Sequence, residues 1–291
     1  MVRRFINKFY VLLVFLFLYA PIFVLMVYSF NDSRSRGNWE GFTLRWYVEL
    51  FSDRQIMSAL YYTIIIGVLS AVISTIIGTA AAIGLDRLGG FRRELVMNIT
   101  YLPVLNPDIV TGIALMILFV FARLQLGFIT LLLSHITFNI PYVMLSVLPK
   151  LKQLDKNLYE AALDLGATPG YAFKTVILPE IMPGVITGAL LAFTLSIDDF
   201  VISFFTTGSG VSNLSIAIYS MARRGINPRI NALSTLMFLS VLALLIIVNI
   251  RMSKENNGKG EKNYASKKQV FASASSSDRV SSSRLYELEQ Q

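Results

Sequence analysis

Six apolar runs, each long enough to cross a lipid bilayer as a helix, are the feature that most constrains how this chain of 291 residues folds. A helix needs about 20 apolar residues to span about 30 Å of hydrocarbon. The runs that meet this requirement are residues 9–30, 59–85, 95–121, 126–148, 184–207 and 232–251. Charged residues make up only 15% of the sequence, against about a quarter in soluble domains. We therefore expect an all-α integral membrane protein.

Lys and Arg are concentrated in alternate connections between the runs. They gather before residue 9, in 86–94, in 150–183 and after residue 252. Positively charged segments tend to stay in the cytoplasm, so we expect six membrane-spanning helices with both chain ends inside. The first run has no small-residue cleavage site, so we expect an uncleaved anchor. The same rule accounts for the net charge of +8 without a nucleic-acid partner.

We expect two regions, a six-helix transmembrane domain over residues 1–252 and a disordered cytoplasmic tail over residues 253–291. The tail is rich in Ser, Lys and Glu, so it cannot bury enough apolar area to offset the entropy of ordering. The sequence has no cysteine, which excludes disulfides and Cys nucleophiles. His135 is the only histidine, so we expect no metal site and a hydrogen-bonded packing role for this side chain.

Two runs carry small residues at every fourth position, which lets helix backbones approach closely in lipid. The stripes comprise Ser70, Ser74, Gly78 and Ala82 in the second run and Gly184, Gly188, Ala192 and Ser196 in the fifth. They predict helix packing, within one chain or between two. Proline removes a backbone hydrogen bond, so we expect interruptions of the third run at Pro103 and Pro107 and of the fourth at Pro141.

The loop 150–183 is long and polar for a compact membrane protein, which points to a partner or a function for it. Apolar residues at helical spacing predict a short helix over 154–165, ended by Gly166. A second helix is predicted to begin after Thr168, with a proline at its first position, and to close at Pro179. A short helix presented at the cytoplasmic edge can dock into a groove of another protein.

The same loop reads Glu-Ala-Ala, three residues, Gly, nine residues, Val, one residue and Leu-Pro. This pattern resembles the signature of importer-type ATP-binding-cassette permeases, with Val176 in the usual Ile position. The resemblance implies a coupling segment that docks into an ATPase subunit, with residues 168–174 as its contact helix. The residues that it assigns to coupling are Glu160, Ala161, Ala162, Gly166 and Pro179. The alternative is an unrelated amphipathic cytoplasmic loop.

Three acidic residues lie inside apolar runs, Asp108 in the third and Asp198 and Asp199 in the fifth. An ionised carboxylate within lipid costs several kcal/mol unless it faces a cavity or a cation. Lys and Arg lie at or beyond the ends of the runs, so an external cation is the economical partner and we assign the three acids to a candidate substrate path. The alternatives are a protonated carboxyl group and a structural anchor between helices.

The predicted outward loops, 31–58 and 207–231, contain many aromatic residues. They are Trp39, Phe42, Trp46, Tyr47, Phe51 and Tyr219. Aromatic side chains suit the membrane interface. The alternatives are that they stack against an organic cation or receive a binding protein.

Further segments sharpen the resemblance within the permease class. They read N-W-E-G-F-T (38–43), P-D-I-V (107–110), Q-L-G-F (125–128), S-H-I-T-F (134–138) and F-T-L-S-I-D-D (193–199). Over about residues 9–250 the chain looks like the C-type permease subunits of spermidine/putrescine importers, which have the MetI-like fold. The resemblance implies a multi-pass protein of the bacterial cytoplasmic (inner) membrane. It also implies as partners a second homologous permease subunit, two ATPase subunits that hold ATP and Mg, an extracytoplasmic substrate-binding protein and lipid, with no cofactor on this chain.

We therefore expect a non-catalytic subunit that moves polyamines while a partner hydrolyses ATP. Linear ammonium chains suit a path in which carboxylates alternate with aromatic or apolar walls. One alternative is another small solute, because the coupling pattern carries no substrate information. A second is an intramembrane enzyme with Asp198 and Asp199 as an acid pair, but neighbours on a helix diverge by about 100° and the hydrolase and phosphate-binding motifs are missing.

Overall fold

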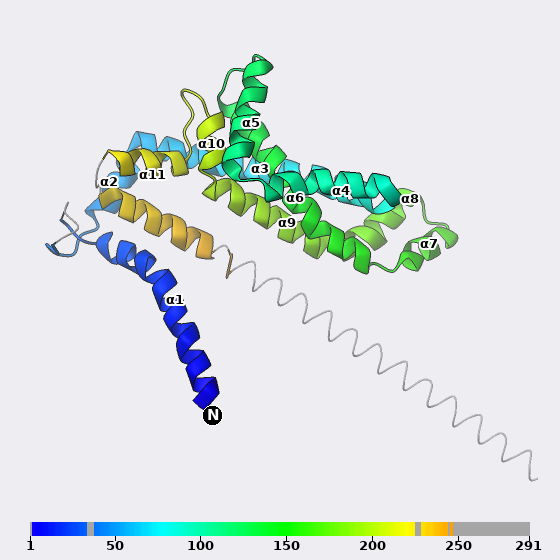
Figure 1. The fold of residues 1–291 in the computed structure, drawn as a ribbon, viewed down its shortest axis with the longest axis horizontal. Coiled ribbons are helices and arrows are strands. Elements are labelled where there is room, and N and C mark those ends of the chain that lie inside the picture. Colours follow the sequence, from blue (N-terminus) through cyan, green and yellow to red (C-terminus); the bar gives the residue numbers. More distant parts are fainter. Residues whose placement is uncertain (1, 34–37, 225–227, 244, 247–291) are drawn as a thin grey trace, which may run out of the picture. The chain divides into compact units, whose positions relative to one another are not determined.

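The structure is a computed structural model and describes residues 2–33, 38–224, 228–243, 245 and 246. The described residues divide into two units, one that ends at residue 237 and one that begins at residue 238. The first unit is built almost entirely from helices (Figure 1), and the described residues of the second are helical. The predicted tail 253–291 lies outside the described residues.

Among the described residues, four helical segments are long and apolar enough to cross a membrane. They are α1 (Val2–Tyr28), α3 (Arg54–Arg87), α6 (Phe128–Gln153) and the continuous segment Pro169–Asp198. The last consists of α8 (Pro169–Ala172), the π-helical turn η1 (Phe173–Ile177) and α9 (Leu178–Asp198). Helices α1, α3 and α6 correspond to the predicted spans 9–30, 59–85 and 126–148.

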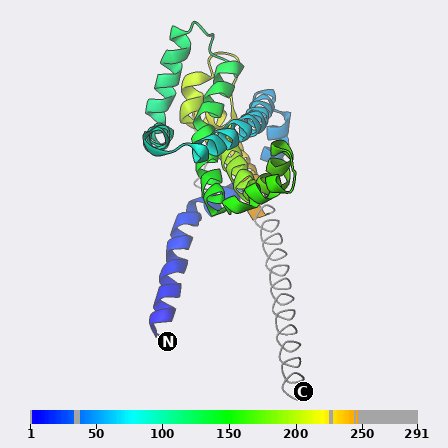
Figure 2. The ribbon, with the colours of Figure 1, turned by 90° about the vertical axis from the view of Figure 1, so that its right-hand side faces the viewer.

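The third predicted span, 95–121, is not one helix. It forms α4 (Gly90–Leu105) and α5 (Asp108–Phe121), which are bent by 107° at the break between them (Figures 1 and 2). Pro103 lies inside α4, and the break comes at Asn106, whose backbone is extended (φ −75°, ψ 144°). The residue before a proline is pushed out of the helical region, so Pro107 ends α4.

The predicted interruption of the fourth run at Pro141 is wrong. Helix α6 continues through Pro141 and Pro149, and Pro141 is buried. Neighbouring helices can hold a proline-containing helix in place when one backbone hydrogen bond is lost. Packing against α3 and α9 supplies that support here.

The fifth predicted span, 184–207, is also divided. Helix α9 ends at Asp198, and α10 (Val201–Thr206) begins two residues beyond Asp199. Asp199 has extended backbone angles (φ −63°, ψ 121°). The two acids thus lie at a break between helices instead of inside one helix, which corrects the expected placement.

The sixth predicted span, 232–251, begins earlier than expected. Its described part is the apolar helix Pro228–Ala243, and residues 247–251 lie outside the described residues. Its first turns join a second apolar cluster with Leu50 of α2 (Arg45–Ser52), Ile56 of α3 and Leu214 of α11 (Leu214–Arg223).

Helices α3, α6 and α9 pack closely because of the small-residue stripes. A Cβ added at Gly78 of α3 would lie 2.8 Å from Val143 Cβ of α6. A Cβ added at Gly188 of α9 would lie 3.1 Å from Val143 Cα. Val143 of α6 therefore fits against a glycine on each neighbouring helix, which confirms the predicted packing role within one chain.

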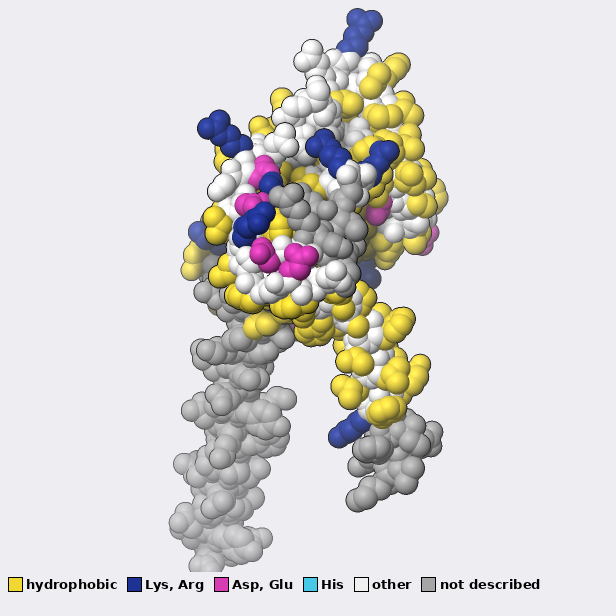
Figure 3. Space-filling view, turned by 90° about the vertical axis from the view of Figure 1, so that its left-hand side faces the viewer, with side chains coloured by type: hydrophobic (Ala, Val, Ile, Leu, Met, Phe, Trp, Pro, Cys, Tyr) yellow, Lys and Arg dark blue, Asp and Glu magenta, His cyan; other side chains and the backbone are white. Residues whose placement is uncertain are grey.

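The outer surface of the fold is strongly apolar. Hydrophobic side chains cover much of the face in Figure 3. Within the described chain, none of the apolar window of α1 is buried. Such a surface requires lipid or another membrane helix around it.

Candidate substrate path and coupling surface

The carboxylate of Asp199 is a structural cap. It accepts hydrogen bonds from the backbone N–H groups of Ile202 (3.2 Å) and Ser203 (2.7 Å) at the start of α10. Its Oδ2 lies 3.7 Å from Nε2 of His135, and the Asp199 side chain is only 7% exposed. These contacts hold the carboxylate within the protein.

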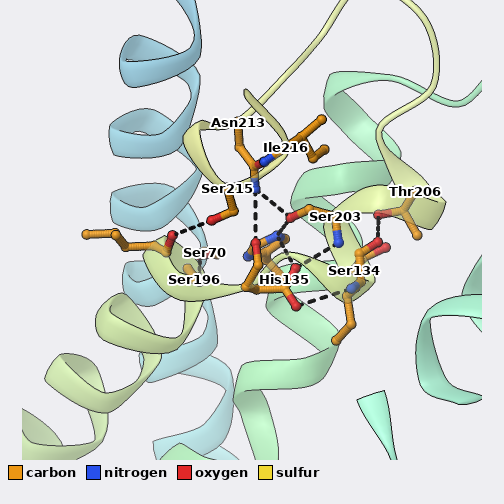
Figure 4. A network of polar contacts seen from close by, with 12 residues as sticks. Ser70, Ser134, His135, Ser196, Ser203, Thr206, Asn213, Ser215 and Ile216 are labelled. Atoms are coloured by element: carbon orange, nitrogen blue, oxygen red, sulfur yellow. Dashed lines mark hydrogen bonds and ion pairs between the residues drawn. The ribbon is translucent and has the colours of Figure 1, made fainter. Parts of the chain in front are cut away.

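Ser203 connects this cap to two other elements. Its Oγ is hydrogen-bonded to His135 Nε2 of α6 at 2.9 Å and accepts a hydrogen bond from Asn213 Nδ2 at 2.7 Å (Figure 4). His135 is 2% exposed. The hydrogen-bonded packing role expected for His135 agrees with these contacts.

Asp198 differs from its neighbour although the two are adjacent in sequence. Its side chain is exposed and makes no hydrogen bond or ion pair within the described part of the chain. Asp108, at the first position of α5, is exposed as well. The structure therefore separates the three predicted path residues into one capped carboxylate and two exposed ones.

Asp108 begins α5, and Asp198 comes just before α10. Gly112, one turn after Asp108 on α5, packs against α10: a Cβ added there would lie 3.3 Å from Ile202 Cα. Asp198 precedes α10 by three residues. The two helices that follow the breaks in the third and fifth spans thus pack against each other.

A second buried polar contact joins helices α3, α6 and α9. It includes Ser196, which precedes the break at Asp199. Ser70 Oγ of α3 and Ser196 Oγ of α9 are 2.8 Å apart, and Asn139 Nδ2 of α6 donates to Ser196 Oγ at 2.8 Å. Asn139 is fully buried. A hydrogen bond between side chains of different helices orients them within an apolar bundle.

Four of the five predicted coupling residues lie in or just after one short helix. Helix α7 (Lys156–Asp164) carries exposed Glu160 and Ala161 and half-buried Ala162. Gly166 ends it as predicted, with a φ of +86° that favours glycine. Leu165 (89% exposed) and Tyr171 (64% exposed) add apolar surface; Leu165 lies in the first predicted short helix and Tyr171 in the predicted contact segment 168–174.

The expected second short helix does not close at Pro179. Thr168 and Pro169 begin α8 as predicted, but α8 continues through η1 into α9 without a break. Pro179 comes just after the π-helical turn η1, so the helix continues past a residue that has no backbone N–H to donate. The predicted contact segment 168–174 is therefore the first part of a membrane-length helix.

The two predicted outward loops meet around a cavity of about 970 Å³. Residues of α2 and the start of α3 line one part of it, and residues between 210 and 229 line the other. Arg229 donates to Glu49 Oε2 (3.0 Å) and to Asp53 Oδ2 (3.1 Å) in its wall. Arg45 also donates to Glu49, at 2.8 Å. These hydrogen bonds, that of Arg45 first, hold the pKa of Glu49 below its usual value.

The aromatic residues of these loops differ in burial and contacts. Trp46 is buried and donates from Nε1 to the Asn31 carbonyl at 2.7 Å, so it holds the loop. Trp39 and Phe42 are exposed. Tyr219 packs on Phe200 beside the α9–α10 break, with ring centroids 4.6 Å apart.

Comparison with known proteins identifies the fold and the family. The profile of the family described as binding-protein-dependent transport system inner membrane component matches residues 74–253. The chain belongs to this family. It is an inner-membrane permease component, and the predicted all-α, MetI-like fold and the membrane location are confirmed.

Two relatives cover most of the chain. The spermidine/putrescine transport system permease protein PotC of Escherichia coli (strain K12) is 38% identical over 260 residues, which are 89% of this chain and 98% of PotC. The putrescine transport system permease protein PotI of the same organism is 44% identical over 233 residues, 77% of this chain and 83% of PotI. The predicted resemblance to spermidine/putrescine permeases is confirmed.

Solved structures support the fold. A bacterial ABC transporter that imports alginate matches with a TM-score of 0.64 and 18% identity, over 84% of this chain and 92% of that chain. The MetNI methionine ABC transporter matches with a TM-score of 0.54 and 19% identity, over 69% of this chain and 97% of that chain. At these identities the likeness concerns the fold alone.

Proposed function

We propose that this chain is the permease subunit of an ATP-driven importer of polyamines, spermidine or putrescine. The similarity to PotC and PotI over most of the chain carries this proposal. The exposed carboxylates of Asp108 and Asp198 support it, because an organic cation is the partner that such groups need within a membrane.

Asp108 and Asp198 form the charged part of the path. Asp108 begins α5 and Asp198 comes just before α10, and these two helices, each of which follows a break in a predicted span, pack against each other at Gly112. An ammonium group passing this point meets one carboxylate from each broken span. Asp199 has a structural role, because its carboxylate accepts the hydrogen bonds of two backbone N–H groups at the start of α10.

The proposal includes the partners that such an importer needs. Two ATPase subunits hold ATP and Mg, and one of them receives α7 and α8 at the surface formed by Glu160, Leu165 and Tyr171. A second homologous permease subunit covers part of the apolar exterior. Both chain ends lie in the cytoplasm, so the cavity at α2 opens outward, where a substrate-binding protein meets it.

Uptake of radiolabelled solutes tests the substrate directly. In a strain whose only importer contains this chain, we expect saturable uptake of spermidine or putrescine that stops when the ATPase is inactivated. A panel of amino acids serves as the control. Saturable uptake of an amino acid without polyamine uptake would overturn the substrate and favour the same importer class with another cargo.

A further inference from the structure

The start of α11 holds the backbone on both sides of Asp198. Ser215 Oγ donates to the carbonyl of Ile197 at 3.3 Å, and Asn213 Nδ2 donates to the carbonyl of Asp199 at 3.2 Å. Figure 4 shows Asn213 and Ser215 directed at this turn from the same segment. The residues immediately before and after Asp198 are therefore both fastened to α11.

This fastening is itself anchored in the core of the fold. Asn213 Nδ2 also donates to Ser203 Oγ, the partner of His135 on α6. The neighbouring Leu214 N–H donates to Thr63 Oγ1 of α3 at 2.8 Å. Asn213 and Leu214 are buried, so the segment that holds the break cannot shift without disturbing α3 and α6.

None of these contacts neutralises the charge of Asp198. Their acceptors are two backbone carbonyls and the hydroxyl groups of Ser203 and Thr63, while the Asp198 carboxylate stays exposed and unpaired within the described part of the chain. A backbone break left unsupported would allow the carboxylate many positions. Contacts from α3, α6, α10 and the start of α11 instead hold the backbone around Asp198. This is the arrangement expected of a binding group that must be held in a defined place.

We propose that Asn213 and Ser215 are positioning residues that fix Asp198 for contact with a cationic substrate. This inference rests on the proposed function. A carboxylate at a fixed point sets the spacing at which ammonium groups of a linear polyamine are recognised. Asn213 and Ser215 act through Asp198 and do not themselves touch the substrate.

Two substitutions separate positioning from folding. Ser215→Ala removes only the hydrogen bond to the Ile197 carbonyl. Asn213→Ser keeps a residue that caps α11 through the Ile216 N–H, but its side chain is too short to reach both the Asp199 carbonyl and Ser203. Ser134→Ala is the matched control, because buried Ser134 Oγ donates to the Thr130 carbonyl of its own helix.

The measurement is polyamine uptake per assembled complex in a double-mutant cycle with Asp198→Asn. We expect Ser215→Ala to lower uptake about 3- to 10-fold in the wild-type background, the effect of one lost hydrogen bond. Asn213→Ser should lower it at least as much, because Asn213 Nδ2 donates two hydrogen bonds. In the Asp198→Asn background we expect each to change it less than about twofold, because the group that they position has lost its charge. Ser134→Ala leaves uptake per complex unchanged in both backgrounds.

Two results would overturn this inference by different routes. Equal fractional losses in both backgrounds, in a complex that imports polyamine, would make Asn213 and Ser215 structural and leave the proposed function standing. A wild-type complex that imports no polyamine would overturn the proposed function and the inference with it. A shift in the ratio of spermidine to putrescine uptake in Ser215→Ala, absent from Ser134→Ala, would support positioning, since a merely structural role changes both substrates equally.

Discussion

Replacing the adjacent acids Asp198 and Asp199 by alanine should change the stability of the protein by very different amounts. Asp199→Ala removes the acceptor of two backbone N–H groups, those of Ile202 and Ser203. Both residues are buried, 1% and 0% exposed, so water does not replace the lost partner. Loss of an N-terminal cap costs about 0.5–2 kcal/mol, and an unsatisfied buried group costs about 1–3 kcal/mol.

We therefore expect Asp199→Ala to destabilise the protein by about 2–3 kcal/mol. Asp198→Ala removes an exposed side chain without partners in the described chain, so its effect should stay within about 0.5 kcal/mol. Asp199→Asn is the control, because Asn keeps one acceptor oxygen and is itself a strong capping residue. It should lose less stability than Asp199→Ala.

Thermal unfolding of the purified protein in detergent measures this difference. For a chain of this size, 2–3 kcal/mol corresponds to a midpoint lowered by about 4–12 °C, whereas Asp198→Ala should unfold within about 2 °C of wild type. Equal shifts for the two alanine variants, or an unchanged midpoint for Asp199→Ala, would refute the division of roles.

Three further predictions concern other parts of the fold. Gly78→Ala places a Cβ 2.8 Å from Val143 Cβ and should cost about 1–3 kcal/mol by overpacking, whereas Gly84→Ala on the same helix meets nothing within 4 Å; equal unfolding midpoints would contradict the packing. Gly166→Pro cannot adopt φ +86°, so inserted protein should lose co-purification with the ATPase and coupled transport, and full uptake would remove the coupling role. Glu49 has a lowered pKa because Arg45 and then Arg229 stabilise its charged form; its contribution to stability is complete above its ordinary pKa of 4.5 and is lost as the pH falls through the lowered folded value. Glu49→Gln should flatten the acid side of a stability profile, and an unchanged profile would contradict this.

The long helices were predictable from sequence because each depends on a local property. Apolar length alone places α1, α3 and α6, and residue 166 ends α7 because glycine readily adopts a positive φ. The small-residue stripe through Gly78 likewise predicts a close helix contact. The break after Leu105 had a local signal in Pro107, yet its angle of 107° depends on how α5 packs against α10.

The break at Asp199 had no such local signal. Apolar residues continue past it to Phe205, which favours one uninterrupted helix. The extended conformation of Asp199 is supported by His135 and Asn213, which are remote in sequence. Tertiary partners thus decide which of two adjacent carboxylates is buried, and for the same reason the sequence did not reveal Asn213 or Ser215 as part of the site.

The central claim, that exposed carboxylates carry a polyamine through this chain, is tested most directly by the double variant Asp108→Asn, Asp198→Asn. The measurement is spermidine uptake by the reconstituted importer, normalised to assembled complex and compared with wild type. Asn keeps the shape and removes the charge, so we expect uptake per complex to fall at least about tenfold, corresponding to about 1.4 kcal/mol of lost stabilisation, while the amount of complex stays near that of wild type. Normal uptake per complex in the double variant would contradict the claim.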